Sequence, residues 1–273
     1  MKLRKYHGLG NDYLVLEESG GVELTPALVR AICHRNKGVG GDGILELRPS
    51  EVAEYGLRIH NPDGSIAEKS GNGLRIFARW LERERGAPSS FGVEVPAGVA
   101  RCEVLSDELI RVQMGRATFE PSLIPVVGDG ELVAEPHATL PLAFTAVGVG
   151  NPHCVVVVER PFDELPWREW GAALEVDPLF PNRVNVQFVR VVDRRAIELR
   201  IWERGAGETL ASGSSASACV AACLKRELVD PGVVEARMEG GVLTIEIDDE
   251  YNIDLTGPVE EVCVATLEPP LPA

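Results

Sequence analysis

An internal repeat constrains this chain more than any other sequence feature. The stretch from Ser70 to Leu81 reads SGNGLRIFARWL, and the stretch from Ser212 to Cys223 reads SGSSASACVAAC. In each stretch a serine and a glycine precede small and apolar residues at helical spacing, a pattern typical of a capped helix N-terminus. The two serines are 142 positions apart, about half of the chain.

The same register continues outside these two stretches. The pairs related by the offset of 142 are Arg58 with Arg200, Ser70 with Ser212, and Gly115 with Gly257. The segment GLGND, which begins at Gly8, returns as GVGNP at Gly148 with an offset of 140. A constant register over several landmarks indicates duplication of a domain-sized unit.

The duplication predicts the domain organisation and the fold class. A chain of 273 residues has room for two domains. We expect a first repeat at 1–117 and a second at 118–273, with the last strand free to return to the first domain. Strand-rich segments with one long helix per half predict an α+β fold, in which each half is a curved mixed β-sheet around a central helix.

Composition excludes several classes of protein. The net charge of −15 without a cluster of Lys and Arg argues against nucleic-acid binding. No apolar run is long enough for a membrane span, and the first residues lack the apolar core of a secretory signal, so we expect a cytoplasmic protein. The six cysteines form no CxxC motif, which indicates neither a metal site nor a disulfide framework.

The repeated helix start has a chemical meaning. Helix N-termini present unpaired N–H groups and a partial positive charge, and they bind carboxylates and phosphates. Two such ends directed at one small anion would suit the carboxylate of an amino acid. They would also stabilise the negative charge that develops when the α-proton is removed.

Five blocks of sequence identify a family resemblance. They are KYHGLGNDY, CHRNKGVGGDGIL, HNPDGSIAEKSGNGLR, GNPHC and ERGAGETLASGS, and they resemble in order and spacing the signature blocks of the diaminopimelate epimerase family. The resemblance implies two pseudo-symmetric α+β domains with the active site in the cleft between them. It also implies a place in lysine biosynthesis, no cofactor, no metal and a homodimer. In that family two thiols on opposite faces of the α-carbon act as base and acid.

The resemblance also assigns site residues. His153 and Glu203 would lie beside the catalytic pair. The residues implied to surround the substrate, a small amino acid such as diaminopimelate, are Asn11, Asn61, Gly71, Asn72, Asn151, Asn185, Glu203, Arg204, Gly213 and Ser214.

Two departures from the family pattern stand out. Ser70 and Ser212 occupy the positions of the two catalytic cysteines, and Gly43 stands where the family has a polar residue. A serine hydroxyl is a weaker acid than a thiol and becomes a useful base only with a partner that takes its proton. The alternatives for both serines are helix capping alone, a direct catalytic role, and an altered site.

Two hypotheses about function follow. The first is an isomerase that acts at the α-carbon of a small amino acid, with Ser70, Ser212, Glu203 and His153 as the catalytic residues. Within this class, a one-base elimination such as a dehydratase reaction needs only one of the two groups. The second hypothesis is a binding or regulatory protein that keeps the anion-binding helix ends without turnover.

Overall fold

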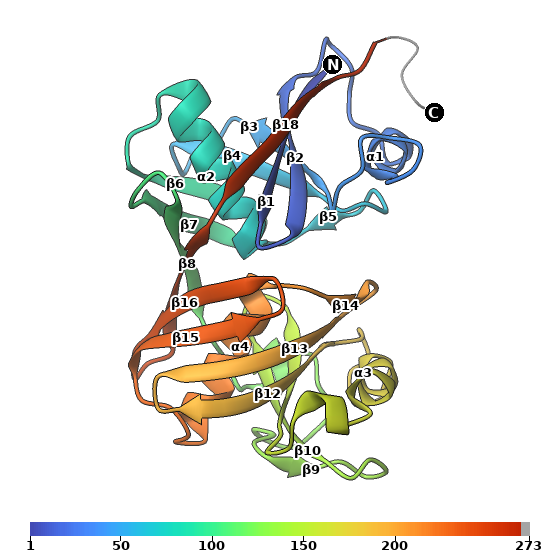
Figure 1. Ribbon diagram of the computed structural model, residues 1–273, viewed down its shortest axis with the longest axis vertical. Helices are drawn as coiled ribbons and strands as arrows, with labels where there is room; N and C mark the ends of the chain where they lie inside the picture. The colour runs from blue at the N-terminus through green and yellow to red at the C-terminus, as the bar shows by residue number, and fades with distance from the viewer. Residues whose placement is uncertain (269–273) are drawn as a thin grey trace. The chain divides into compact units, whose positions relative to one another are not determined.

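The computed structural model describes residues 1–268 and divides into two compact units (Figure 1). Unit 1 comprises Met1–Gln113 together with the segment that begins at Gly257, and unit 2 comprises Met114–Thr256. The chain therefore passes from one unit to the other within β8 (Leu109–Arg116) and returns within β17 (Asn252–Pro258).

Unit 1 is one mixed sheet with two helices. Its other strands are β1 (Lys2–Gly8), β2 (Asn11–Glu18), β3 (Ile44–Arg48), β4 (Tyr55–His60), β5 (Ile66–Ala67), β6 (Ser90–Val95), β7 (Gly98–Val104) and β18 (Glu260–Thr266). Hydrogen bonding runs in the order β18, β1, β2, β3, β4, β6, β7, β8, with β5 on the end of β4. The β2–β3 and β4–β6 pairs are parallel, and a helix connects each of these pairs.

Unit 2 repeats the order of β1 to β8 in its strands β10 to β17. Its strands are β9 (Glu135–Pro136), β10 (Ala143–Gly148), β11 (Pro152–Val157), β12 (Asn185–Asp193), β13 (Ala196–Glu203), β14 (Gly207–Thr209), β15 (Gly232–Met238), β16 (Gly241–Ile247) and β17. Pairing runs from β10 through β11, β12, β13, β15 and β16 to β17, and β11–β12 and β13–β15 are the parallel pairs. The α+β class and the duplication expected from the sequence are confirmed.

A central helix fills the concave side of each sheet. In unit 1 it is α2 (Gly71–Arg85), in which every residue from Gly71 to Leu81 is buried. It contacts β1, β2 and β7, and it ends at Gly86, whose φ of 64° is the left-handed conformation that glycine adopts at little cost. In unit 2 the helix is α4 (Gly213–Lys225), which contacts strands β10 to β13 as well as β15 and β16.

A second helix in each unit connects the parallel pair. In unit 1 this helix is α1 (Pro26–Cys33), which starts at the Thr25 cap as its sequence predicts. In unit 2 it is α3 (Trp167–Glu175), which the sequence analysis did not anticipate. No side chain caps its N-terminus, so the local signal of a helix start is absent there.

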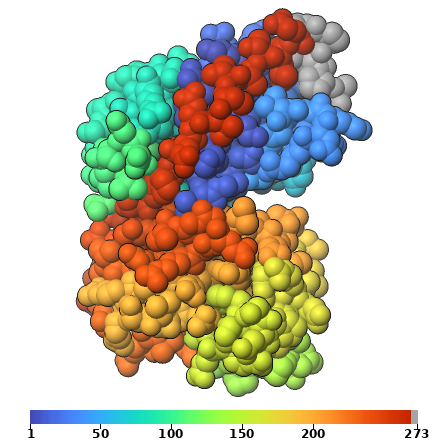
Figure 2. Space-filling model, in the orientation of Figure 1, coloured from blue at the N-terminus to red at the C-terminus, as the bar shows by residue number. Residues whose placement is uncertain are grey.

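The strand β18 completes unit 1 after the chain has left it once. It pairs antiparallel with β1 from Lys2 opposite Thr266 to His7 opposite Glu260, and Figure 2 shows it in red beside the blue N-terminal segment. The N-terminal ammonium of Met1 donates a hydrogen bond to the Leu267 carbonyl at 3.0 Å. Within residues 1–268 no helix combines the length and the apolar character needed to cross a membrane.

The burial of α4 on all sides makes a prediction. Ala218 is fully buried in α4, so Ala218→Leu adds three carbon atoms to a filled space and should lower the free energy of unfolding by about 1–3 kcal/mol. The matched control is Ala172→Leu, the same change at an exposed position of α3. Urea denaturation compares the variants, and an equal effect of both changes would contradict close packing around α4.

Candidate active-site residues in the two units

Ser70 is the N-cap of α2. Its backbone is extended, with φ −140° and ψ 119°, and its Oγ accepts a hydrogen bond from the Gly73 N–H at 3.0 Å. The hydroxyl of Tyr13, at the start of β2, lies 3.2 Å from the same oxygen. Ser70 Oγ therefore lies in the positive field of the helix N-terminus and has a second hydroxyl within hydrogen-bond reach.

Ser212 is the N-cap of α4 in the same conformation. Its φ of −148° and ψ of 126° match those of Ser70 within ten degrees, and its Oγ accepts from the Ser215 N–H at 3.4 Å. The nearest hydroxyl is that of Ser214, at 3.4 Å. Each unit thus presents one serine hydroxyl at the N-terminus of its central helix, as the repeat predicts.

The cysteines of the chain do not replace the two missing thiols. Cys33, Cys102, Cys154, Cys219 and Cys223 are buried, and Cys263 is exposed. Burial raises the pKa of Cys33 and of Cys102 to about 12, so neither thiol supplies a thiolate near neutral pH.

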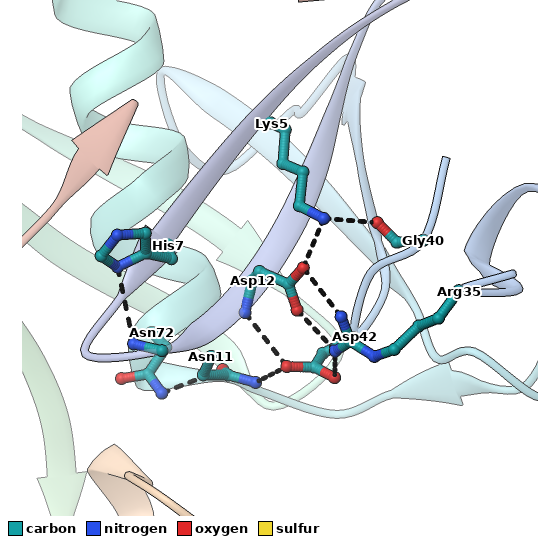
Figure 3. A network of polar contacts seen from close by, with 9 residues as sticks. Lys5, His7, Asn11, Asp12, Arg35, Gly40, Asp42 and Asn72 are labelled. Carbon is teal, nitrogen blue, oxygen red and sulfur yellow. Dashed lines mark hydrogen bonds and ion pairs between the residues drawn. The ribbon is translucent and has the colours of Figure 1, made fainter. Parts of the chain in front are cut away.

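Amide side chains beside the α2 N-terminus form a connected chain (Figure 3). Asn72 Nδ2 donates to Asn11 Oδ1 at 2.9 Å, and Asn11 Nδ2 donates to Asp42 Oδ2 at 2.8 Å. At the other end, Arg75 Nη2 donates to Asn72 Oδ1 at 2.9 Å. These contacts fix the orientation of Asn11 and Asn72, two of the amides that the resemblance places around a substrate.

Two carboxylates anchor the same network, and the sequence analysis did not single them out. Burial favours the neutral acid, but hydrogen bonds from Arg35 and Lys5 outweigh it and hold the pKa of Asp12 at about 2. Asp42 accepts from Arg35 at 2.7 Å, while burial raises its pKa. Figure 3 shows these side chains together. These four charged residues all lie inside the two N-terminal signature blocks, and that location is the sequence signal that points to them.

Arg75 is the one fully buried cation of this group. Burial lowers its pKa to about 9, and its guanidinium donates to the Gly71 carbonyl at 3.3 Å as well as to Asn72. The turn between β1 and β2 approaches it closely, because a Cβ at Gly8 would lie 2.9 Å from Nη2. The glycine at the start of GLGND therefore leaves room for Arg75.

The buried amide of Asn185 organises the site residues of unit 2. Its Nδ2 donates to the Pro152 carbonyl at 3.0 Å, and its Oδ1 accepts from the Arg204 N–H at 3.0 Å. The side chain of Arg204 donates to the Asn182 carbonyl at 3.3 Å and, among residues 1–268, pairs with no carboxylate. Its guanidinium is therefore available to an anionic ligand.

Glu175, at the end of α3, holds the segment that carries Arg204. Its two carboxylate oxygens accept from Trp202 Nε1 at 2.8 Å and from the Gly205 N–H at 2.9 Å. Glu203, the last residue of β13, lies between these two anchors. The sequence analysis missed Glu175 because α3 itself was not expected.

His153 is a buried residue of β11. Its Nε2 lies 2.8 Å from Asn151 Oδ1, so the ring donates to Asn151 from this nitrogen. Burial lowers the pKa of His153 to about 3, against an opposing effect of Gln187 and with a smaller contribution from the charge of Arg204. At neutral pH the imidazole is uncharged, and it orients Asn151 in the way that Asp42 orients Asn11.

Two further groups lie outside these networks. Asn61 begins the turn after β4, where its Nδ2 donates to Ser65 Oγ at 2.9 Å. No hydrogen bond described for residues 1–268 joins it to Asn11 or Asn72. Gly71 and Gly213 are the first residues of α2 and α4, and both are buried.

Gly43 has no room for the polar side chain that the family places there. A Cβ at this position would lie 2.5 Å from the His60 carbonyl oxygen and 2.8 Å from Tyr13 Cε1. The Tyr13 ring therefore occupies the space next to Gly43, and its hydroxyl reaches Ser70.

Gly43→Ala tests this crowding. The added methyl group should lower the free energy of unfolding by about 1–3 kcal/mol more than Gly130→Ala does. Gly130 is the matched control because it also has a positive φ but has no atom within 4 Å of the added Cβ. Thermal denaturation of the two variants gives the comparison, and equal losses would mean that the ring of Tyr13 yields freely.

His153→Gln tests the buried neutral imidazole. The unfolded chain binds a proton at a histidine near pH 6.5, whereas the folded protein resists protonation of His153 down to about pH 3. Between these values the unfolded state binds more protons, so the contribution of His153 to stability is lost as the pH falls, by about 1.4 kcal/mol per pH unit. His153→Gln should flatten the stability profile from pH 6 to pH 4, and His34→Gln at an exposed histidine should not.

Comparisons with known proteins agree with this architecture. The sequence model of a family described as diaminopimelate epimerase matches residues 3–120 and 145–262, one segment in each half of the chain. Diaminopimelate epimerase 2 of Nostoc sp. is 44% identical over 98% of this chain and 95% of its own length. Diaminopimelate epimerase of Pelotomaculum thermopropionicum is 40% identical over 96% and 97%.

Solved structures share the fold at low sequence identity. A probable proline racemase from Agrobacterium radiobacter K84 has a TM-score of 0.72 at 17% identity, covering 98% of this chain and 93% of that one. A hydroxyproline epimerase from Agrobacterium vitis has a TM-score of 0.71 at 17% identity, covering 97% and 91%. The duplicated fold is thus that of the amino-acid racemases and epimerases. The identity to the Nostoc and Pelotomaculum relatives over nearly the whole chain, together with the extent of the family match, shows that the chain belongs to the diaminopimelate epimerase family.

Proposed function

We propose that the protein inverts one α-carbon of diaminopimelate by removing a proton on one face and returning a proton on the other, without a cofactor. The observation that carries this proposal is the pair of serine caps, Ser70 and Ser212, in matching conformations at the N-termini of two equivalent helices. Such a reaction needs two acid–base groups, and the duplication supplies one from each unit.

The residues around each cap support an amino-acid substrate. The first turns of α2 and α4 offer backbone N–H groups to a carboxylate, which would also stabilise the carbanion formed at the α-carbon. Arg204 offers a guanidinium for a second carboxylate. A diamino dicarboxylate presents two carboxylates, so it uses both kinds of group.

Serine at both positions lowers the expected rate but leaves the reaction possible. A thiol ionises near pH 8.5, and a helix N-terminus lowers that value further. An aliphatic hydroxyl is a much weaker acid, so Ser70 and Ser212 depend on neighbouring groups to hold the proton. A cytoplasmic location and a homodimer, both expected from the sequence, stay predictions of this proposal.

Incubation with each stereoisomer of diaminopimelate in deuterium oxide tests the function. Proton NMR should show deuterium entering the α-position together with conversion of one stereoisomer into the other. Thermal stabilisation by diaminopimelate without any α-exchange would contradict the proposal and favour the binding protein. Release of an unsaturated product from a hydroxylated amino acid would instead favour one-base elimination.

Restoring the thiols gives a sharper prediction. Ser70→Cys combined with Ser212→Cys should raise the rate of α-exchange at pH 7 by on the order of 10²-fold, because the thiols ionise more readily. Ser89→Cys, at an exposed serine, is the matched control and should leave the rate unchanged. An unchanged rate in the double variant would remove both serines from the reacting centre.

A further inference from the structure

We propose, resting on the function above, that Tyr13 is the positioning residue of the N-terminal acid–base group: its hydroxyl holds the proton that Ser70 exchanges with the substrate. Nothing in the sequence analysis assigned a role to this residue. The inference starts from the 3.2 Å separation of the Tyr13 hydroxyl oxygen and Ser70 Oγ.

The local geometry restricts how the two hydroxyls are arranged. Ser70 Oγ accepts from the Gly73 N–H at 3.0 Å and still has its own proton to donate. When the Tyr13 hydroxyl donates to Ser70, the serine proton can point toward a substrate. When the serine donates to the tyrosine oxygen instead, a lone pair of Oγ can face the substrate. In the acid arrangement both hydroxyls are protonated, and in the base arrangement the tyrosine oxygen has lost its proton, so the two arrangements differ by one proton.

The burial of Tyr13 limits the movement of its hydroxyl. The side chain is 7% exposed, and its ring edge lies against Gly43, where a Cβ would come within 2.8 Å of Cε1. In place of a polar side chain at position 43, this chain has a glycine and a tyrosine whose ring covers it. Glycine at position 43 therefore gives up one polar side chain and leaves room for the Tyr13 ring, whose hydroxyl reaches Ser70.

The duplication gives independent support. Leu14 pairs with Ile44 in the parallel β2–β3 pair, and Cys154 pairs with Val186 in the parallel β11–β12 pair. The residue before Leu14 is Tyr13, and the residue before Cys154 is His153. Tyr13 therefore occupies in unit 1 the position that His153 occupies in unit 2, where the imidazole donates to Asn151.

In the base arrangement Tyr13 is a phenolate that accepts a hydrogen bond from the Ser70 hydroxyl. The bond between the α-carbon and hydrogen breaks, its proton goes to Ser70 Oγ, and the serine proton moves to the tyrosine oxygen. The electron pair stays on the α-carbon, so the negative charge passes from the phenolate to the carbanion. A phenol is a stronger acid than an aliphatic alcohol, which makes it the better holder of the charge before reaction.

Tyr13→Phe tests the proposal because it removes the hydroxyl and keeps the ring over Gly43. Interconversion of the stereoisomers should fall by about 10²-fold. Deuterium wash-in should fall equally for the stereoisomer whose α-proton faces Ser70. When the reaction starts from the other stereoisomer, deuterium should still enter the α-position without inversion. The acid–base group of unit 2, which exchanges that proton, is intact in this variant.

Tyr6→Phe is the matched control. Tyr6 is the register partner of Tyr13 on β1, and its buried hydroxyl has no hydrogen-bond partner among residues 1–268. This variant should keep both exchange rates and the melting temperature of the unsubstituted protein. A loss of wash-in from both stereoisomers in Tyr13→Phe would show a general structural role and overturn the proposal.

A second measurement does not depend on turnover. In a Ser70→Cys background, the rate of alkylation by iodoacetamide as a function of pH reports the ionisation of the introduced thiol. Adding Tyr13→Phe should shift this profile to higher pH, since the thiolate loses a hydrogen-bond donor. The same background should also lose much less exchange activity on Tyr13→Phe, because a thiol needs no partner to hold its proton.

The outcomes separate the two proposals. An unshifted alkylation profile overturns the pairing of Tyr13 with position 70, whatever the activity. Absence of wash-in from both stereoisomers in the unsubstituted protein overturns the proposed function and, with it, the proton transfer. A shifted profile in that case would still establish the hydrogen bond, so the failure would lie in the function and not in the geometry.

Discussion

The central constraint on each unit is a helix buried by its own sheet. All residues of α2 from Gly71 to Leu81 are buried, and α4 is buried almost as completely by small residues. The sides of such a helix are covered by packing contacts. Its backbone can bind a ligand through the N–H groups of the first turn, which have no partner within the helix. Ser70 and Ser212 stand at this end, so the packing of the core determines where chemistry can take place.

Much of this could be predicted from sequence because the decisive signals are local or repeated. A serine cap followed by glycine and an apolar run needs only neighbouring residues, and the offset of 142 multiplies that signal. Asn11 and Asn72 were both singled out from their sequence blocks, but the hydrogen bond between them was not predicted.

The contacts that escaped prediction join residues distant in sequence. Tyr13 and Ser70 are 57 positions apart, and Trp202 and Glu175 are 27 apart. Neither pair has a motif of its own, since each depends on how strands and helices pack. The helix α3 lacked a cap signal, and without it the anchoring carboxylate of Glu175 could not be recognised. The partners in each pair come together only when the chain folds, so no local sequence pattern identifies them.

Duplication has preserved the positions while their side chains have diverged. Gly43 corresponds to Asn185 in the aligned strands, and the first leaves room for a ring while the second ties Pro152 to Arg204. The two units therefore orient polar groups near a helix N-terminus in different ways, through the Tyr13 ring in unit 1 and through the Asn185 amide in unit 2.

The buried guanidinium of Arg75 extends this difference to electrostatics. One repeat later the equivalent residue is Ser217, and both side chains donate to the carbonyl of the first residue of their helix, Gly71 or Gly213. The two helix N-termini thus share backbone geometry but differ by one elementary charge, because an arginine with a pKa of about 9 stays protonated at pH 7. Unit 1 therefore carries a buried positive charge in the first turns of its central helix, where unit 2 has a neutral hydroxyl.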